Sequence, residues 1–161
     1  MRGDIQFRRL SEIAPENIIA LMNDSDVQRH LPLARGHFGP TDCERFVQSK
    51  ERMWTERGFG PWAFVRDGEF IGWGGLQPEG DDADIGLVLR PQWWGVGRHL
   101  YERIISYAFH ELGLDSVIAM LPPTRSRGGG LQRLGFVPDG EALLSGERFV
   151  RFRLHRKATT G

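Results

Sequence analysis

The sequence has little cysteine, no long apolar run and no excess of charge of either sign. Its 161 residues include a single cysteine, Cys43, which excludes an internal disulfide and a zinc site built from cysteines. No apolar run approaches the roughly 18 residues that a membrane-spanning helix needs. Basic and acidic residues both number 21, so the formal net charge is zero, which argues against a nucleic-acid partner. We therefore expect a cytoplasmic protein with no membrane segment.

The length and composition favour one globular domain. Hydrophobic residues make up 40% of the chain and charged residues 26%, as in ordinary globular proteins. We find no internal repeat and no stretch that marks a domain boundary. A chain of this length fits the usual range of about 100–200 residues per domain. We expect a single domain over residues 1–161, with a disordered tail at 157–161.

Glycine is abundant, and charge is unevenly spread along the chain. The 21 glycines predict tight turns or backbone that lies close to a ligand. Residues 1–84 carry 10 basic and 15 acidic side chains, whereas residues 85–161 carry 11 and 6. An acidic half beside a basic half suits a cationic ligand on one side and an anionic ligand on the other. Chance produces the same asymmetry, so it does not decide the function.

Hydrophobic periodicity predicts strands and helices that alternate along the chain. The predicted strands cover residues 5–8, 62–65, 69–76, 85–89, 116–121, 136–137 and 148–154. The predicted helices cover residues 14–22, 41–57, 97–112 and 126–135. Asp67-Gly68 has the composition of a tight hairpin turn. This order predicts one mixed α+β domain.

The segment most informative about chemistry is Gln92-Trp93-Trp94-Gly95-Val96-Gly97, between an apolar strand and the longest predicted helix. A glycine-rich turn there would present backbone N–H groups at a helix N-terminus, where the helix dipole favours phosphate. Gly95 and Gly97 can adopt positive φ and let a pyrophosphate approach the backbone. Arg90 and Arg98 flank the turn and can donate charge-assisted hydrogen bonds. The turn therefore predicts a phosphate site that needs no metal.

Two alternatives explain the same glycine spacing. The first is a plain strand-to-helix turn whose tryptophans belong to the core. If Trp93 and Trp94 instead support the phosphate turn, we expect one of them to be buried and the other partly exposed. The second is a dinucleotide-binding fold, but its third glycine would fall at Leu100. Its nucleotide loop also normally follows the first strand, whereas this turn follows several.

The hexapeptide resembles the Q/R-x-x-G-x-G/A signature of the GCN5-related N-acetyltransferase (GNAT) family. The surrounding pattern is similar to the ribosomal-protein (RimJ/RimL-like) branch of that family, and the resemblance runs from about residue 5 to 154. The phrases that carry it are Asn23-Asp24-Ser25-Asp26-Val27, Phe109-His110-Glu111-Leu112-Gly113-Leu114 and Leu134-Gly135-Phe136.

The resemblance implies a splayed, mostly antiparallel mixed sheet flanked by helices. The sheet would hold acetyl-CoA as co-substrate, without a metal, between strands 84–90 and 116–121. The edge at 87–89 would pair with the pantetheine arm like an added strand, and the N–H groups of residues 95–100 would hold the pyrophosphate. The implied cofactor-binding residues are Leu87, Val88, Leu89, Arg90, Gln92, Gly95, Val96, Gly97, Arg98, His99, Leu100, Thr124 and Arg127.

Three positions depart from the pattern of the branch. Thr124 and Arg127 stand where an Asn and a Ser usually support the cofactor, and Leu131 stands where many relatives place a tyrosine acid. These departures favour the alternative of a catalytically weak acyl-CoA-binding or regulatory module on the same fold. A third hypothesis, nucleic-acid binding, rests on four C-terminal arginines: Arg148, Arg151, Arg153 and Arg156.

The leading hypothesis is acetyl transfer from acetyl-CoA to a primary amine, of a small molecule or a peptide N-terminus, by direct attack. A protonated amine must first lose a proton. Asp84, at the start of the strand beside the turn, is the candidate base or water-orienting residue. A solvated carboxylate at a strand entry is the alternative. Glu79, Asp81 and Asp82 are expected to form an acidic rim that attracts a cationic amine.

The acceptor pocket and the oligomeric state are less well specified. His30 and His37 lie in the loop that forms an acceptor wall in the family, so either can contact the amine. Trp62 and Trp73 can line the same pocket or belong to the core. We expect a monomer or a homodimer.

Overall fold

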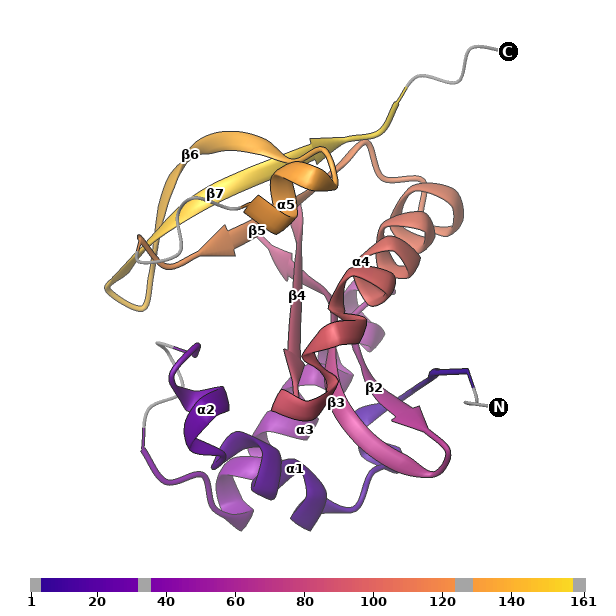
Figure 1. The fold of residues 1–161 in the computed structure, drawn as a ribbon, viewed down its shortest axis with the longest axis vertical. Coiled ribbons are helices and arrows are strands. Elements are labelled where there is room, and N and C mark those ends of the chain that lie inside the picture. Colours follow the sequence, from indigo (N-terminus) through magenta and orange to yellow (C-terminus); the bar gives the residue numbers. More distant parts are fainter. Residues whose placement is uncertain (1–3, 32–35, 124–128, 158–161) are drawn as a thin grey trace.

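The computed structural model describes residues 4–31, 36–123 and 129–157 (Figure 1). Thr124 and Arg127, both predicted to contact the cofactor, lie outside the described residues. So does most of the C-terminal tail that was predicted to be disordered.

One seven-stranded sheet organises the domain, with strand order β1-β2-β3-β4-β5-β7-β6. Neighbouring strands are antiparallel except for β4 and β5, which are parallel. The strands are β1 (Gln6–Arg8), β2 (Pro61–Arg66), β3 (Glu69–Glu79), β4 (Asp82–Leu89), β5 (Ser116–Leu121), β6 (Val137–Leu144) and β7 (Glu147–His155). This arrangement confirms the predicted α+β class and mostly antiparallel sheet.

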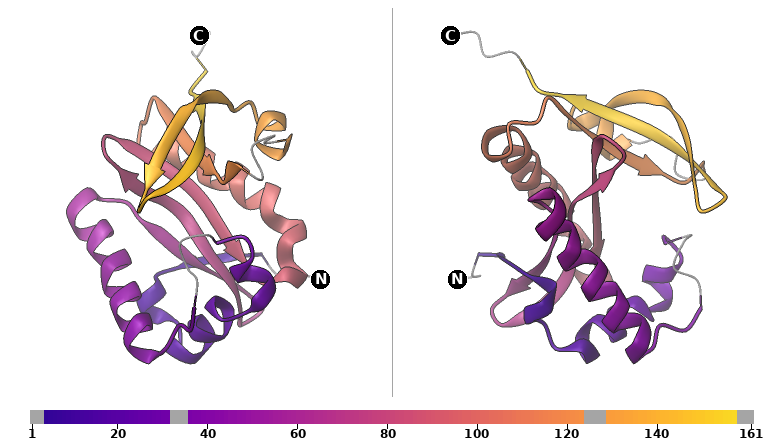
Figure 2. Two further views of the ribbon diagram at one scale, coloured as in Figure 1. Left: turned by 90° about the vertical axis from the view of Figure 1, so that its left-hand side faces the viewer. Right: turned by 180° about the vertical axis from the view of Figure 1, so that it is seen from behind.

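Helices cover both faces of the sheet (Figure 2). The helical elements are η1 (Leu10–Glu12), α1 (Pro15–Met22), α2 (Ser25–Gln28), α3 (Pro40–Arg57), η2 (Pro91–Val96), α4 (Gly97–Ser106), η3 (Tyr107–Glu111) and α5 (Gly129–Arg133). Helices α1, α2 and α3 lie on one side of β2–β4, and α4 lies on the other. The side chains of β4 alternate accordingly: Ile85 and Leu89 pack in the core with α4, whereas Val88 packs with α1 and α3.

The tight turns follow the predicted chemistry. Asp67 and Gly68 have φ values of 50° and 79°, the two positive angles of a type I′ hairpin turn. Ser145 and Gly146 repeat this geometry between β6 and β7, with φ values of 51° and 78°. The long predicted helix changes character near its end, because residues 107–111 form a π-helical turn after α4.

Strands β4 and β5 diverge after a short paired segment. In the described chain, their pairing consists of Asp84 opposite Ile118. Strand β4 stays paired with β3 over its whole length, from Asp82 to Leu89. Figure 1 shows β4 running away from β5, β6 and β7, which lie across its upper end. The other edge of residues 85–89 is therefore not covered by β5.

Candidate active site

The peptide groups at the uncovered edge of β4 can be assigned from the β3–β4 ladder. The N–H of Arg90 donates to the carbonyl of Ile71 at 2.9 Å, so the even-numbered residues of β4 bond to β3. By the alternation of a strand, the peptide groups of Leu87 and Leu89 face the open edge. The Leu89 carbonyl accepts the indole N–H of Trp94 at 3.0 Å. The open edge therefore consists of Leu87 and the N–H of Leu89, and Val88 contributes its side chain to the opposite core.

The segment after β4 is helical and not an open glycine loop. Residues 91–96 form a 3-10 helix, and α4 begins directly at Gly97, whose φ is −56°. The prediction of positive φ at Gly95 and Gly97 is wrong, because the 3-10 helix leads into α4 without a left-handed residue. The N–H of Gly97 already donates to the Trp94 carbonyl. The N–H groups that a helix start leaves without a helical partner are thus those that follow, at Arg98 and His99.

The two glycines instead leave space. A Cβ placed on Gly95 would have no heavy atom within 4 Å, and one on Gly97 would meet only the Leu87 Cδ1 atom, at 3.9 Å. Gly86, on β4, is equally free of neighbours. Packing within the protein therefore does not require these glycines. They keep a surface bare where the start of α4 approaches the open edge of β4, which fits a diphosphate held by helix amides.

Asp84 lies at the last point of contact between β4 and β5. It is half-buried, and its neighbour across the ladder on β3 is Gln77. Burial, followed by the negative charge of Glu79, raises the pKa of Asp84 to about 7, while Lys50 opposes this shift. Asp84 is therefore not a fully exposed carboxylate, and its role as base or as a solvated strand-entry residue stays a prediction.

Lys50, on α3, completes this cluster and was not anticipated. Its Nζ atom donates to Gln77 Oε1 at 2.5 Å and lies 5.3 Å from the ring centroids of both Phe46 and Trp73. Burial lowers the pKa of Lys50 to about 8, and the charge of Asp84 opposes that shift. The sequence holds a signal for it, since Lys50 interrupts the apolar stripe of α3 between Phe46 and Trp54.

Comparison with known proteins identifies the family. A family model described as an acetyltransferase (GNAT) domain matches residues 4–136. The chain belongs to the GNAT acetyltransferase family. This confirms the predicted family, the predicted fold and the assignment of an acetyltransferase domain whose co-substrate is acetyl-CoA.

Individual relatives share the fold of this GNAT domain at low sequence identity. An acetyltransferase from Agrobacterium tumefaciens has a TM-score of 0.77 at 18% identity, over 97% of this chain and 94% of that one. The Campylobacter jejuni N-acetyltransferase PseH, solved with acetyl coenzyme A, has a TM-score of 0.68 at 18% identity, over 96% and 100% of the two chains.

A curated relative matches over a shorter stretch. The FsC-acetyl coenzyme A-N(2)-transacetylase of Aspergillus fumigatus is 36% identical over a 73-residue alignment, which covers 38% of this chain and 31% of that protein. The match with the GNAT domain thus spans about a third of the length of this relative.

Two arginines of the GNAT domain that flank the segment with Gly95 and Gly97 are engaged with the protein itself. The Arg90 Nε atom donates to the Phe70 carbonyl at 2.8 Å, which directs this guanidinium towards β3. Arg98 is exposed and pairs with Glu102 one helical turn later, at 3.1 Å. Arg98 can exchange this exposed pair for a phosphate at little cost, whereas Arg90 holds the end of the strand.

The remaining predicted cofactor residues divide between the core and the surface. The side chain of Leu100 is fully buried, so only its backbone is available to a ligand. His99 is exposed on the first turn of α4. A surface hollow of about 590 Å³ lies beside η2, lined by Arg66, Asp67, Gln92, Trp93, Gly95 and Val96.

The aromatic candidates also separate. Trp94 is 48% exposed and meets His30 edge-to-face, with ring centroids 5.5 Å apart. Trp93 packs against the core but is only partly buried, so the prediction that one of the pair is buried is wrong. His30 is thereby placed beside η2, whereas His37 is exposed near Gly39.

Trp62 and Trp73 belong to the packed interior of the GNAT domain. Trp62 contacts the rings of Trp54 and Tyr107 at centroid distances of 5.3 and 4.9 Å. Trp73 is buried beneath Phe46. Neither tryptophan forms a free wall of an acceptor pocket. The Trp73 ring instead packs beside Lys50, with its centroid 5.3 Å from the Nζ atom.

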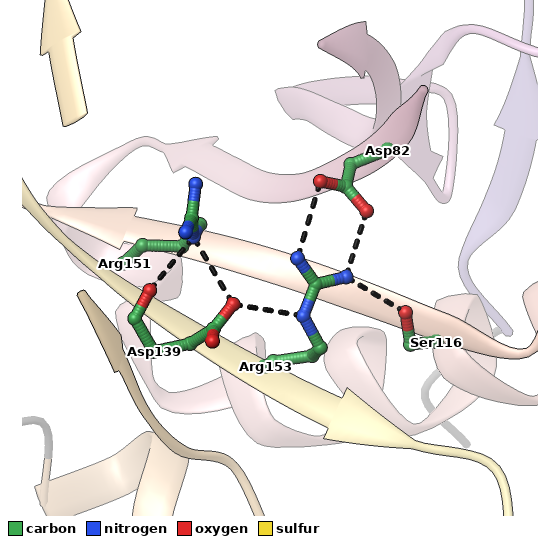
Figure 3. Close-up of polar contacts among 5 residues, drawn as sticks. All are labelled: Asp82, Ser116, Asp139, Arg151 and Arg153. Atoms are coloured by element: carbon green, nitrogen blue, oxygen red, sulfur yellow. Dashed lines mark hydrogen bonds and ion pairs between the residues drawn. The ribbon is translucent and has the colours of Figure 1, made fainter. Parts of the chain in front are cut away.

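Asp82 does not belong to an acidic rim, which corrects the prediction. Figure 3 shows its carboxylate bound by both terminal nitrogens of Arg153, at 2.7 and 3.2 Å. The same guanidinium donates to Asp139 at 2.8 Å and to Ser116 Oγ at 2.9 Å. The hydrogen bonds from Arg153 hold the pKa of Asp82 below its usual range. We call these four residues, with Arg151 on Asp139, the arginine clamp.

The arginines of the predicted basic patch are all paired with acids. Arg151 and Arg153 belong to the clamp. Arg148 pairs with Glu141, and Arg156 lies 3.6 Å from Asp115. This pairing removes the charge surplus on which the nucleic-acid hypothesis rested.

A proton donor for the departing thiol is not assigned. Thr124 and Ser126 lie outside the described residues. Leu131 is buried in the core and has no polar atom to donate. Within residues 4–31, 36–123 and 129–157, no cluster of side chains suits a metal ion, and no helix is long and apolar enough to cross a membrane.

Proposed function

We propose that this GNAT domain transfers the acetyl group of acetyl-CoA to a primary amine, of a small molecule or a peptide N-terminus, by direct attack. One observation carries the proposal. The half-buried Asp84 stands where β4 and β5 separate, at the inner end of an open strand edge that leads to the bare glycine surface of α4. A proton acceptor, a backbone edge and a phosphate site thus follow one another along β4.

The residues of the open edge would bind the co-substrate. When bound, acetyl-CoA supplies a thioester whose acetyl group an amine can attack. The peptide groups of Leu87 and Leu89 would pair with its pantetheine arm, and the Leu87 N–H is the candidate to polarise the thioester carbonyl. The first amides of α4, with the space at Gly95 and Gly97, would hold its pyrophosphate. Roles for Gln92, Val96, Arg98 and the residues beyond the described chain stay predictions.

Asp84 would accept the proton that the amine must lose. Its pKa of about 7 leaves both forms populated near neutral pH, so it can take up a proton and release it again. The transfer can run directly from the ammonium or through one water molecule. A group tuned in this way favours catalysis over a module that only binds acyl-CoA.

The names of two similar proteins support an amine as the acceptor. The Aspergillus protein is named for transfer to an N(2) atom, and PseH is named as an N-acetyltransferase. The phrases shared with the ribosomal-protein branch, set out above, support placing the chain within that branch. Its cytoplasmic location and its state as a monomer or homodimer stay predictions.

Release of thiol from acetyl-CoA tests the proposal, with a panel of primary amines and peptides and a reaction without amine as the blank. We expect amine-dependent release, and Asp84→Asn should lower kcat about 100-fold or more while the Kd for acetyl-CoA stays unchanged. Asp115→Asn, which changes an exposed carboxylate before β5, is the matched control and should keep full turnover. Tight acetyl-CoA binding without thiol release for any amine would leave only a binding module.

A further inference from the structure

Lys50 occupies a position that packing alone does not explain. It projects from the middle of α3 onto the sheet and is half-buried between aromatic rings. Its Nζ atom donates a hydrogen bond to a neutral amide, that of Gln77. Among the residues described, no carboxylate forms an ion pair with it. A buried cation without a direct counter-ion is costly, so its retention calls for a reason.

The choice of lysine is itself unusual in this chain. The 21 basic residues include only two lysines, Lys50 and Lys157, and all the others are arginine. An ammonium is a compact charge on a flexible stem, and its protonation responds to its surroundings, unlike that of a guanidinium. The one lysine of the interior therefore lies where a small, tunable charge fits between rings.

Asp84 is a titratable group on which the charge of Lys50 acts. Gln77, which holds the Lys50 Nζ atom, lies directly opposite Asp84 in the β3–β4 ladder. Side chains at directly opposed positions project from the same face of a sheet. Asp84 and Lys50 each act on the charge of the other.

The other charges around Asp84 oppose its ionisation or are already paired. From β3 comes Glu79, whose negative charge favours protonation of Asp84. On β4 itself, Asp82 is bound by Arg153 from β7. From β5, the residue that faces Asp84 is the apolar Ile118. Lys50, from α3, is the positive charge that favours the carboxylate form.

We propose that Lys50 is a positioning residue for Asp84, held by Gln77 and the Phe46 and Trp73 rings so that its ammonium keeps Asp84 available as a proton acceptor. The inference rests on the proposed role of Asp84 in amine acetylation. In the proton transfer, the ammonium of the acceptor loses its proton, the Asp84 carboxylate gains it, and Lys50 keeps its own. Lys50 acts on Asp84 only through the electrostatic field of its positive charge.

Two readouts test the proposal on the full chain. The first is the titration of the Asp84 carboxyl carbon by NMR on ¹³C-labelled protein, assigned as the signal lost in Asp84→Asn. The second is the acidic limb of the pH profile of kcat/KM. Loss of the positive charge in Lys50→Met should make Asp84 titrate about one pH unit higher and should move the acidic limb by the same amount. Activity near pH 7 would fall several-fold and recover at higher pH.

Matched variants separate charge from packing. Lys50→Arg keeps a positive charge and should restore the titration and the acidic limb to near the parent values. Lys50→Gln removes the charge but keeps a polar group of similar length, and it should behave like Lys50→Met. It also preserves the test if the Met variant folds poorly. Thermal melting and calorimetry with acetyl-CoA check that fold and co-substrate binding are intact.

The outcomes distinguish this inference from the proposed function. If the Asp84 carboxyl titrates alike in the parent, Lys50→Gln and Lys50→Met proteins, the role of Lys50 is overturned. If Lys50→Arg shifts the titration as far as Lys50→Met, packing and not charge is responsible, and the inference also fails. Full turnover of Asp84→Asn would instead remove the base from the proposed function, whatever the titration of Asp84 shows.

Discussion

The two ends of β4 differ in how their polar groups are used. At its beginning, Asp82 is bound by Arg153, which also holds Asp139 and Ser116 on neighbouring strands. At its end, Leu87 offers a peptide group to the open edge, and Gly97 leaves the start of α4 bare. The first end uses its hydrogen bonds to join strands, whereas the second leaves peptide groups that β5 does not cover. A strand can thus be anchored at one end so that the other end can remain open.

Asp82 and Asp84 show the same contrast within three residues. Both lie on one face of β4, because side chains two residues apart share a face. A guanidinium reaches Asp82 and lowers its pKa, whereas burial and the charge of Glu79 raise the pKa of Asp84 to about 7. One carboxylate is therefore a fixed anion of the arginine clamp, and the other can exchange a proton near neutral pH.

The largest expected effect is on acetyl-CoA binding, at the end of β4 and the start of α4. Gly97→Val should weaken acetyl-CoA binding about 10- to 100-fold, because its side chain fills the bare surface beside Leu87. The fold should persist, since the site is open and the backbone φ of −56° suits any residue. Calorimetry with acetyl-CoA measures the loss, with Ser106→Val at the far end of α4 as the control. Equal affinities of the two variants would mean that the glycine surface is not the phosphate site.

Substitutions at the beginning of β4, where Asp82 is bound, should change the stability of the fold and not the binding of acetyl-CoA. Arg153→Leu removes the guanidinium that Asp82, Asp139 and Ser116 share, and it should lower the free energy of unfolding by about 2 kcal/mol. Arg148→Leu breaks an exposed, solvent-screened pair with Glu141 and should leave that free energy almost unchanged. Urea unfolding compares the two variants. Equal urea midpoints for the two variants would mean that the arginine clamp stabilises the fold no more than the exposed pair does.

The smallest expected effect is on stability: substitutions of Asp82 and Asp84 should change the free energy of unfolding with opposite signs. Asp82 has a lowered pKa in the folded state, so its charge stabilises the protein above about pH 4, and this contribution is lost as the pH falls further. Asp84 has a raised pKa, so it stays protonated in the folded state above its ordinary value of about 4, and stability is lost as the pH rises from there through about 7. At pH 8, Asp82→Asn should therefore destabilise the fold and Asp84→Asn should stabilise it, each by about 1 kcal/mol or less. Denaturant unfolding at pH 5 and pH 8 measures both, and changes of the same sign would contradict the contrast.

Much of the fold could be predicted from local patterns. The alternation of strands and helices, the Asp67-Gly68 turn and the apolar strand before the long helix all follow from short-range periodicity and turn chemistry. The glycine spacing before α4 also predicts a phosphate site there, which stays a prediction, and the helical geometry of the segment differs from the expected loop. Short-range spacing reports which groups lie near a helix start, but it does not report their φ angles.

The contacts that give the acids their roles could not be predicted in this way. Arg153 is 71 residues from Asp82 along the chain, and Lys50 reaches Gln77 across 27 residues. No local pattern specifies which of several nearby acids an arginine will meet. The placement of a lysine in an apolar helical stripe was the one available sign of the Lys50 cluster.

The sequence by itself determined the elements and the glycines, because both depend on interactions between residues close in the chain. The tertiary structure alone decided which carboxylate would be neutralised by a guanidinium and which would be left half-buried beside a lysine. That decision depends on burial and on the distance between charges, and both arise only when α3, β4 and β7 come together.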